Sequence, residues 1–262
     1  MHTPVSLYLS ASPLWLSALV VVLLPTIAAA WCLVRLRRRL GLKLLASNNE
    51  VAGFKFAVVG VIYAVMLAFA VIIVWERYAE AEMAVIQEAG AAATLRRLAA
   101  GSGTDAVQMR RALRNYLSTA IERDWPRMAL EQESPEVTAA LDELYAAAVS
   151  LAQGGSEPPA VLVEMFRQID ALTQARRGRL HMAVGIVPSV LWAALALGGI
   201  LTVTFTLFFA TANLRAQIAM TCILSVIVMM GLFVIIAIDH PFTGPVHIGS
   251  EPLQRVLEDS NR

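Results

Sequence analysis

The chain contains 262 residues, of which 58% are hydrophobic and only 16% are charged. Soluble domains usually contain about 45–50% apolar and about 25% charged residues. Asp, Glu, Lys and Arg are absent from four stretches, 14–34, 56–75, 180–209 and 216–238. Each can cross a bilayer core of about 30 Å as a helix. The composition excludes an ordinary soluble enzyme, a disordered tail and a disulfide-stapled secreted domain. It predicts an all-α membrane protein with four transmembrane helices.

A basic cluster follows the first apolar stretch. The segment 35–55, predicted to be a loop, carries one acidic residue, Glu50, and six basic residues: Arg35, Arg37, Arg38, Arg39, Lys43 and Lys55. The positive-inside rule predicts that this loop is cytoplasmic, and anionic lipid head groups are compatible ligands for it. The segment 76–179 then falls on the periplasmic side of a bacterial inner membrane. Arg176, Arg177 and Arg179, next to the third apolar stretch, oppose this orientation.

The segment 76–179 is predicted to be a helical extramembrane domain inserted between helices two and three. Helix two is expected to extend to about residue 100, because one side of it repeats at spacings of three and four. That side contains Tyr78, Ala81, Val85, Glu88, Ala92, Leu95 and Ala99. The run Gly101-Ser102-Gly103 is predicted to end the helix.

Three further helices are predicted in this domain. Asp105 and Gln108 resemble a capping box, and Ser134 precedes Pro135 as a helix N-cap does. The third helix starts after Pro158-Pro159 and can continue through Gly178 into the third membrane helix. Residues 239–262 are left as a C-terminal tail.

Glu88 lies on the repeating side of helix two and has two interpretations. It is either a buried partner of an arginine or a charge that lines an aqueous vestibule. Buried carboxylates are normally paired, so the structural interpretation is favoured. Arg110, Arg111 and Arg114 are the candidate partners.

Two faces of helix two are distinctive. Gly60, Ala64 and Ala68 form a small-residue face that allows another helix to approach closely. The opposite face contains Ile62, Met66, Phe69 and Ile73. These four side chains either face lipid, as favoured for a lone helix, or form a hydrophobic neck around a pore.

Motifs of reactive chemistry are not found in the sequence. It contains no phosphate-binding glycine loop, nucleophile elbow, zinc-binding His-Glu-x-x-His or paired cysteine motif. Asp239, His240 and His247 are a weak alternative as metal ligands, so we expect no metal, no other cofactor and no enzyme activity. The net charge of +1 argues against nucleic acid as a partner. The apolar stretches lack the charges that proton-driven and voltage-sensing proteins use.

An ordered set of motifs resembles the bestrophin-like family. These are Ser47–Phe54, which runs into Val58–Phe69, then Trp75-Glu76, Glu88-Ala89, Tyr116, Glu122–Pro126 and Asp239–Pro245. The family is similar to bestrophins, which are pentameric anion channels with four membrane helices and an apolar neck on the second. The resemblance implies that Ile62, Met66, Phe69 and Ile73 occupy the neck. Bestrophins place the segment between helices two and three in the cytoplasm, whereas the basic loop here predicts the opposite side.

Two hypotheses follow. The first is an oligomeric ion channel, for anions by family analogy, with helix two lining an apolar-necked pore. The second is a structural or sensory membrane protein whose helical domain binds a partner without conduction. Both predict a homo-oligomer, a pentamer by analogy, whose partners are membrane lipid and, for a channel, small ions.

Overall fold

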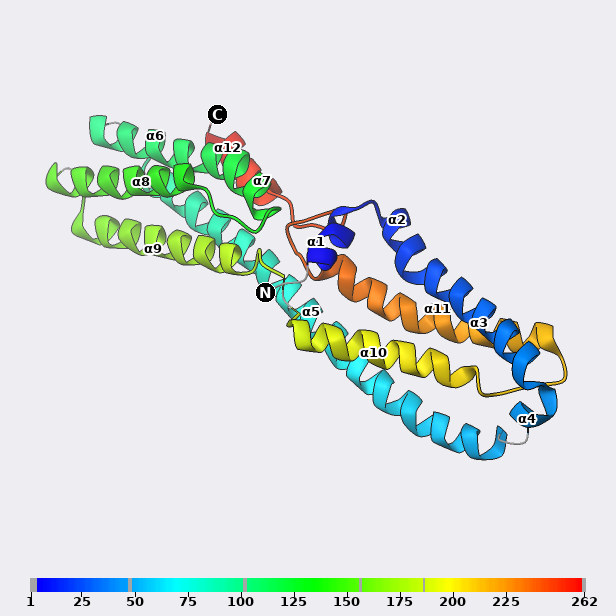
Figure 1. Ribbon diagram of the computed structural model, residues 1–262. Helices are drawn as coiled ribbons and strands as arrows, with labels where there is room; N and C mark the ends of the chain where they lie inside the picture. The colour runs from blue at the N-terminus through cyan, green and yellow to red at the C-terminus, as the bar shows by residue number, and fades with distance from the viewer. Residues whose placement is uncertain (1–3, 47–48, 101–102, 156, 186, 261–262) are drawn as a thin grey trace. The chain divides into compact units, whose positions relative to one another are not determined.

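The computed structural model describes residues 4–46, 49–100, 103–155, 157–185 and 187–260, and its regular elements in these ranges are all helices (Figure 1). This confirms the predicted all-α class. The chain divides into two compact units, each described by itself. The membrane unit comprises Met1–Glu76 and Ile186–Asp239, and the polar unit comprises Arg77–Gly185 and His240–Arg262. Residues 47–48 of the first motif and 101–102 of the predicted helix break lie outside the described residues.

The membrane unit is built from apolar helices. They are α1 (Pro4–Ala11), α2 (Leu14–Ala18), the π-helical turn η1 (Leu19–Leu23), α3 (Leu24–Leu40), α4 (Leu42–Ala46), the first part of α5 (Asn49–Leu98), α10 (Ser189–Thr206) and α11 (Leu214–Ile238). Four helical stretches in the described residues are long and apolar enough to cross a membrane: Leu14–Leu40, Asn49–Leu98, Ser189–Thr206 and Leu214–Ile238. At about 1.5 Å per residue, even the 18 residues of α10 span about 27 Å.

The first apolar stretch contains a local irregularity that has a covalent cause. Pro25 lies in the first turn of α3, directly after the wide turn η1. Proline has no N–H to donate, and its ring clashes with the carbonyl four residues earlier. The wider turn accommodates this conflict without breaking the helix. Beyond it, α3 packs against α11, where the Thr26 and Ser225 hydroxyls are hydrogen bonded at 3.0 Å.

Two predicted boundaries in the membrane unit are wrong. Segment 35–55 is largely helical rather than a loop, because α3 continues to Leu40 and α5 begins at Asn49. The third membrane helix begins at Ser189 rather than residue 180, since α9 ends at His181. Pro188 precedes α10 with φ −58° and ψ 146°, and the Val187 N–H donates to the Asp239 carboxylate at 2.9 Å. A helix running through this point would lack an N–H at Pro188 and would need the Val187 N–H that Asp239 already accepts, so the chain breaks.

The polar unit contains the remainder of α5 and the later helices. These are α6 (Thr104–Thr119), the π-helical turn η2 (Ala120–Asp124), α7 (Trp125–Met128), α8 (Pro135–Gln153), α9 (Pro159–His181) and α12 (Glu251–Ser260). α6 begins one residue before the predicted capping box, with Gly103 at the N-cap and no side-chain cap. Buried residues from α5, α6, α8 and α9 form one core that includes Val85, Leu95, Leu113, Leu144 and Ile169.

The C-terminal segment is not only a tail. Phe242 is buried, and its ring lies edge-on to that of Trp125 with centroids 6.3 Å apart. The Trp125 indole N–H donates to the Ile248 carbonyl at 3.1 Å. Leu253 of α12 is fully buried in the core of the polar unit. Residues 240–260 are therefore an integral part of that unit.

Candidate functional site

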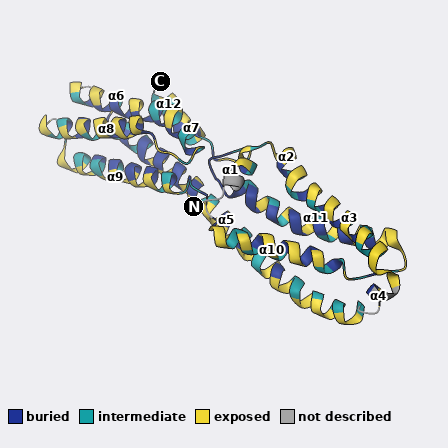
Figure 2. Ribbon diagram, viewed as in Figure 1, coloured by how far each residue is buried: buried dark blue, intermediate teal, exposed yellow. Residues whose placement is uncertain are grey.

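The predicted neck residues lie on the side of α5 that the membrane unit leaves uncovered. Ile62, Phe69 and Ile73 are 65%, 63% and 44% exposed. Figure 2 shows exposed residues along much of the membrane part of α5. Met66 is half-buried, and a β-carbon on Gly198 of α10 would lie 3.0 Å from its methyl group. Three of the four side chains thus form an exposed apolar stripe, while Met66 lies at its edge against α10.

The predicted packing face is also uncovered within the protomer. Ala64 and Ala68 are exposed, and Gly60 is half-buried. A β-carbon built on Gly60 would meet no heavy atom within 4 Å among the described residues. This small-residue face does not pack against α10 or α11 of its own chain.

Close packing inside the membrane unit uses glycines on the other helices. A β-carbon on Gly198 would lie 2.6 Å from the Tyr63 ring, and one on Gly231 would lie 2.5 Å from the Leu67 side chain. The Tyr63 hydroxyl donates to the Leu195 carbonyl at 3.2 Å. Large side chains of α5 therefore fit against glycines of α10 and α11, and this fixes which face of α5 points outward.

A second set of contacts holds the turn between α10 and α11. Asn49 exchanges two hydrogen bonds with the backbone of Ala210, at 2.7 and 3.1 Å. Arg37 donates to the Gln217 side chain at 2.7 Å and to the Ala212 carbonyl at 3.1 Å. The beginning of α5 and the end of α3 are thereby joined to this turn.

The polar unit encloses a cluster of buried charges centred on Arg179. Its guanidinium donates to both oxygens of Glu88, at 2.7 and 3.0 Å, and to Asp124 at 3.1 Å. The Trp125 ring covers it, with the guanidinium carbon 4.3 Å from the ring centroid. The Tyr116 hydroxyl donates to Glu88 at 2.6 Å. Every one of these hydrogen-bonding groups is buried, so the pairs are shielded from water.

Arg176 completes the cluster. Its guanidinium donates to both Asp124 oxygens, at 2.9 and 3.3 Å, and to the Ser134 carbonyl at 3.3 Å. The Ser134 N–H in turn donates to Asp124 at 3.3 Å. Two guanidinium groups thus balance the two carboxylates of Glu88 and Asp124. Because each charge has partners, the desolvation cost of burial is offset.

The protonation states follow from this geometry. Burial raises the pKa of the Tyr116 hydroxyl well above its ordinary value, and the adjacent Glu88 carboxylate raises it further. Burial alone would lower the pKa of Arg179, but Glu88 outweighs it, and the pKa lies above its ordinary value. Tyr116 therefore remains a neutral donor and Arg179 a cation. The cluster joins side chains of α5, α6, η2, α7 and α9 and is suited to holding these elements together.

The predicted partners of Glu88 are wrong. Arg110 donates instead to the Ala99 carbonyl at 2.6 Å, after the end of α5, and Arg111 and Arg114 are exposed. The true partner, Arg179, is 91 residues away along the chain. The burial of Arg176 and Arg179 also means that they do not contribute free surface charge.

Asp239, His240 and His247, the weak metal alternative, have separate partners. The His247 ring lies 2.7 Å from the Gly244 carbonyl, the His240 ring lies 3.2 Å from Glu131, and Asp239 accepts from Val187. Among the described residues, no three His, Cys, Asp or Glu side chains are grouped to hold a metal.

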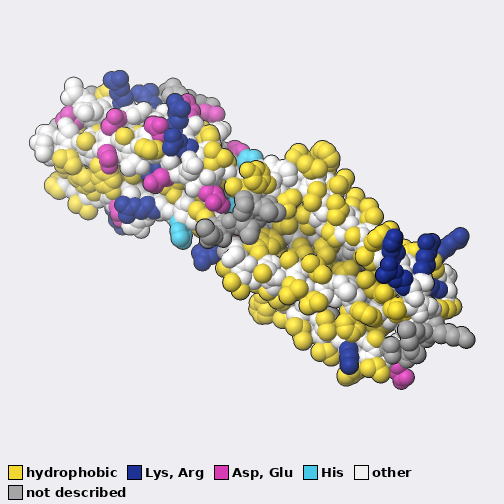
Figure 3. All heavy atoms as spheres, in the orientation of Figure 1, with side chains coloured by type: hydrophobic (Ala, Val, Ile, Leu, Met, Phe, Trp, Pro, Cys, Tyr) yellow, Lys and Arg dark blue, Asp and Glu magenta, His cyan; other side chains and the backbone are white. Residues whose placement is uncertain are grey.

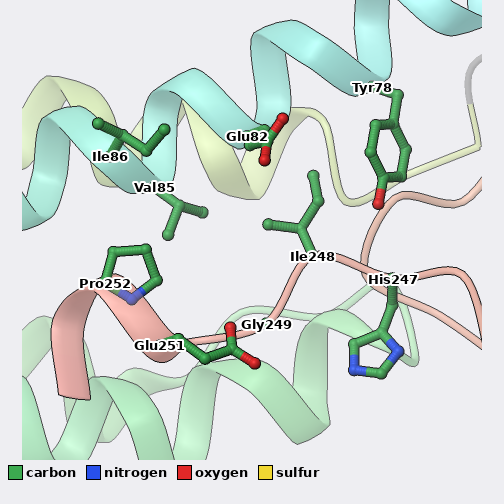
Figure 4. Close-up of a pocket in the computed structure, with 9 residues that line it drawn as sticks. All are labelled: Tyr78, Glu82, Val85, Ile86, His247, Ile248, Gly249, Glu251 and Pro252. Atoms are coloured by element: carbon green, nitrogen blue, oxygen red, sulfur yellow. The ribbon is translucent and has the colours of Figure 1, made fainter. Parts of the chain in front are cut away.

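A surface cavity of about 280 Å³ lies between α5 and the segment leading into α12 (Figure 4). The carboxylates of Glu82 and Glu251 point into it from the two sides, and His247 lies at one end. Its floor includes the apolar side chains of Val85 and Ile248. The cavity is acidic and open to solvent, in contrast to the enclosed cluster at Arg179.

The sequence of this chain matches a known protein family over most of its length. The sequence model of the Bestrophin-like domain matches residues 20–253 of this chain. The chain belongs to the Bestrophin-like family. The matched range includes α5, the buried charge cluster and the segment that returns to α12, so the family covers both units. No curated protein matches this chain.

Solved bacterial bestrophin homologues share this fold. One crystal structure from Klebsiella pneumoniae superposes with a TM-score of 0.72 at 15% identity, covering 91% of this chain and 98% of its own. A second, also from Klebsiella pneumoniae and phased with zinc, gives a TM-score of 0.70 at 16% identity, covering 89% and 97%. At this level of identity the likeness concerns the fold.

The family motifs converge on one place in the structure. Glu88, Tyr116, Asp124 and Trp125 belong to three separate motifs of the sequence, and all contact Arg179 or its carboxylate partner. Arg179 itself was not recognised as a site residue. The available signal was its position on the buried side of α9, in register with Met165, Ile169, Leu172 and Arg176. A cation on a buried stripe requires a buried anion.

Proposed function

We propose that this Bestrophin-like protein is the subunit of an oligomeric ion channel in which α5 lines the pore. The observation that supports it is the exposed stripe of Ile62, Phe69 and Ile73 on a membrane helix that packs through a different side against glycines of α10 and α11. In an assembly with α5 innermost, copies of this stripe surround the axis. An apolar constriction of this kind gates by dewetting.

Anions are the proposed permeant species. Lys55 is exposed and lies seven residues before Ile62, on the same side of α5 at the helical period. A ring of Lys55 side chains at one mouth raises the local concentration of anions. The analogy with bestrophins supports the same choice.

The test is conductance of the purified full-length protein in planar bilayers. We expect a chloride current that rises in Phe69→Ala, because a smaller side chain widens and wets the constriction. Val163→Ala is the control, since this exposed valine lies on α9 in the polar unit. Silence of both the wild type and Phe69→Ala contradicts the channel and favours a non-conducting protein whose polar unit binds a partner.

We propose further that the polar unit lies in the periplasm. The support is the excess of arginine near the end of α3, which the positive-inside rule assigns to the cytoplasm. A cysteine introduced at Asn115, an exposed position of the polar unit, should react with a membrane-impermeant maleimide in intact spheroplasts after Cys32 and Cys222 are replaced. Labelling only after lysis contradicts this orientation.

A further inference from the structure

The helix α3 has two chemically different faces. Its inner face packs against α11 through Thr26, Leu33 and Arg37, and Arg37 is held by Gln217. The outer face exposes three large apolar side chains. Leu24, Ile27 and Trp31 are 58%, 67% and 58% exposed.

The same outer face continues into three exposed cations. Arg35, Arg38 and Arg39 follow Trp31 at helical spacing and share its side of α3. The Arg35 guanidinium carbon lies 4.7 Å from the centroid of the Trp31 ring. None of the three forms an ion pair with a carboxylate among the residues that the structure describes.

The order of residues along this face matches the layers of a bilayer leaflet. Leu24 and Ile27 belong to a stretch that is apolar enough to cross a membrane, tryptophan prefers the head-group level, and Arg38 lies about 10 Å beyond Trp31 along the helix. Figure 3 shows Lys and Arg side chains gathered at this end of the membrane unit, whereas hydrophobic side chains cover much of its remaining visible surface. The charge of the cluster is therefore available to a ligand rather than neutralised within the chain.

We propose that the outer face of α3 binds anionic phospholipid head groups through Arg35, Arg38 and Arg39, with Trp31 placed beside the glycerol region. Guanidinium groups bind phosphate oxygens in a planar, bidentate manner. Three uncompensated cations favour phosphatidylglycerol over phosphatidylcholine, whose head group has no net charge. Arg37 differs from its neighbours because its donors already bind Gln217 and Ala212.

The test measures lipid retained by the full-length protein. The protein is incubated in mild detergent with equal amounts of phosphatidylglycerol and phosphatidylcholine, and bound lipid is counted by native mass spectrometry. We expect the wild type to be enriched in phosphatidylglycerol. Arg35→Gln/Arg38→Gln/Arg39→Gln should lower the ratio by up to about a hundredfold, since each of the three cations near an anionic surface contributes about fivefold in affinity.

Two matched variants separate lipid recognition from net charge. Arg97→Gln/Arg111→Gln/Arg114→Gln removes three exposed cations from the polar unit and should retain the wild-type ratio. Arg35→Lys/Arg38→Lys/Arg39→Lys keeps the charge and should retain most of the enrichment. Excess inorganic phosphate should leave the lipid bound. The proposal is overturned by an equal lipid ratio in the wild type, by an equal loss in the polar-unit variant, or by complete displacement with inorganic phosphate.

Discussion

The two parts of α5 bury different kinds of residue. In the membrane unit, Tyr63 is buried whereas Ala64 and Phe69 are exposed. In the polar unit, Ala81 and Ala92 are buried. Water drives apolar side chains inward, whereas lipid is as apolar as the side chains and provides no such force. Shape therefore decides which side chains are buried in the membrane unit. Hydrophobicity together with paired charge decides it in the polar unit.

The largest loss of stability is expected in the polar unit, for a change that breaks its pairs of buried charges. Arg179→Ala leaves Glu88 buried without its cation and should reduce the free energy of unfolding by about 3–5 kcal/mol. Chemical unfolding followed by tryptophan fluorescence in detergent measures it. Arg177→Ala, at an exposed neighbouring position, should change the free energy by less than about 0.5 kcal/mol. Equal effects of the two variants would show that the cluster contributes little.

The close fit between large side chains and glycines in the membrane unit can be tested by substituting the glycines. Gly198→Val places a side chain on the Tyr63 ring, where even a β-carbon would lie at 2.6 Å. We expect a loss of about 1–3 kcal/mol from overpacking, read as a lower midpoint of thermal unfolding in detergent. Gly60→Ala, which meets no neighbour within 4 Å in the described chain, should leave the protomer unaffected. A stable Gly198→Val protein would refute the close fit.

A pH titration tests how burial of Tyr116 affects the stability of the polar unit. The pKa of Tyr116 is raised in the folded state, so its contribution is fully present below the unfolded value near pH 10 and is lost as the pH rises above it. The free energy of unfolding should fall by up to about 1.4 kcal/mol per pH unit there. Tyr116→Phe should lack this component. An identical slope in both proteins contradicts the assignment.

The smallest effect is expected for polar contacts in the membrane unit. Thr26→Val removes the hydroxyl that meets Ser225 at 3.0 Å. Hydrogen bonds between membrane helices contribute about 0.6 kcal/mol on average. A small drop in thermal stability, well below that of Gly198→Val, is the expected result. A loss as large as that of Arg179→Ala would mean that polar contacts dominate both units.

The helical class could be predicted from sequence because uncharged stretches and periodic stripes are local properties. The break between α9 and α10 was missed, since its cause combines Pro188 with a hydrogen bond from Val187 to Asp239, 52 residues away. The ion pair of Glu88 was anticipated, but its partner was not. The arginines of α6 lie closer to Glu88 in the sequence, but their spacing is the same as that of many surface residues. Arg179 could be identified as the partner only by knowing which sides of α5 and α9 are in contact.

The wide turn η2 has a consequence for how this chain can change. Like η1, it ends two residues before a proline, here Pro126. A π-helical turn contains one residue more than the α-helical turn that it replaces. Deleting one residue from the α-helical part of α6 would rotate everything on one side of the deletion by about 100°. Asp124 would then leave the phase in which it meets Arg176 and Arg179. The wide turn η2 can instead lose its extra residue by becoming α-helical, so it is the point in this helix where the chain can be shortened without changing that phase.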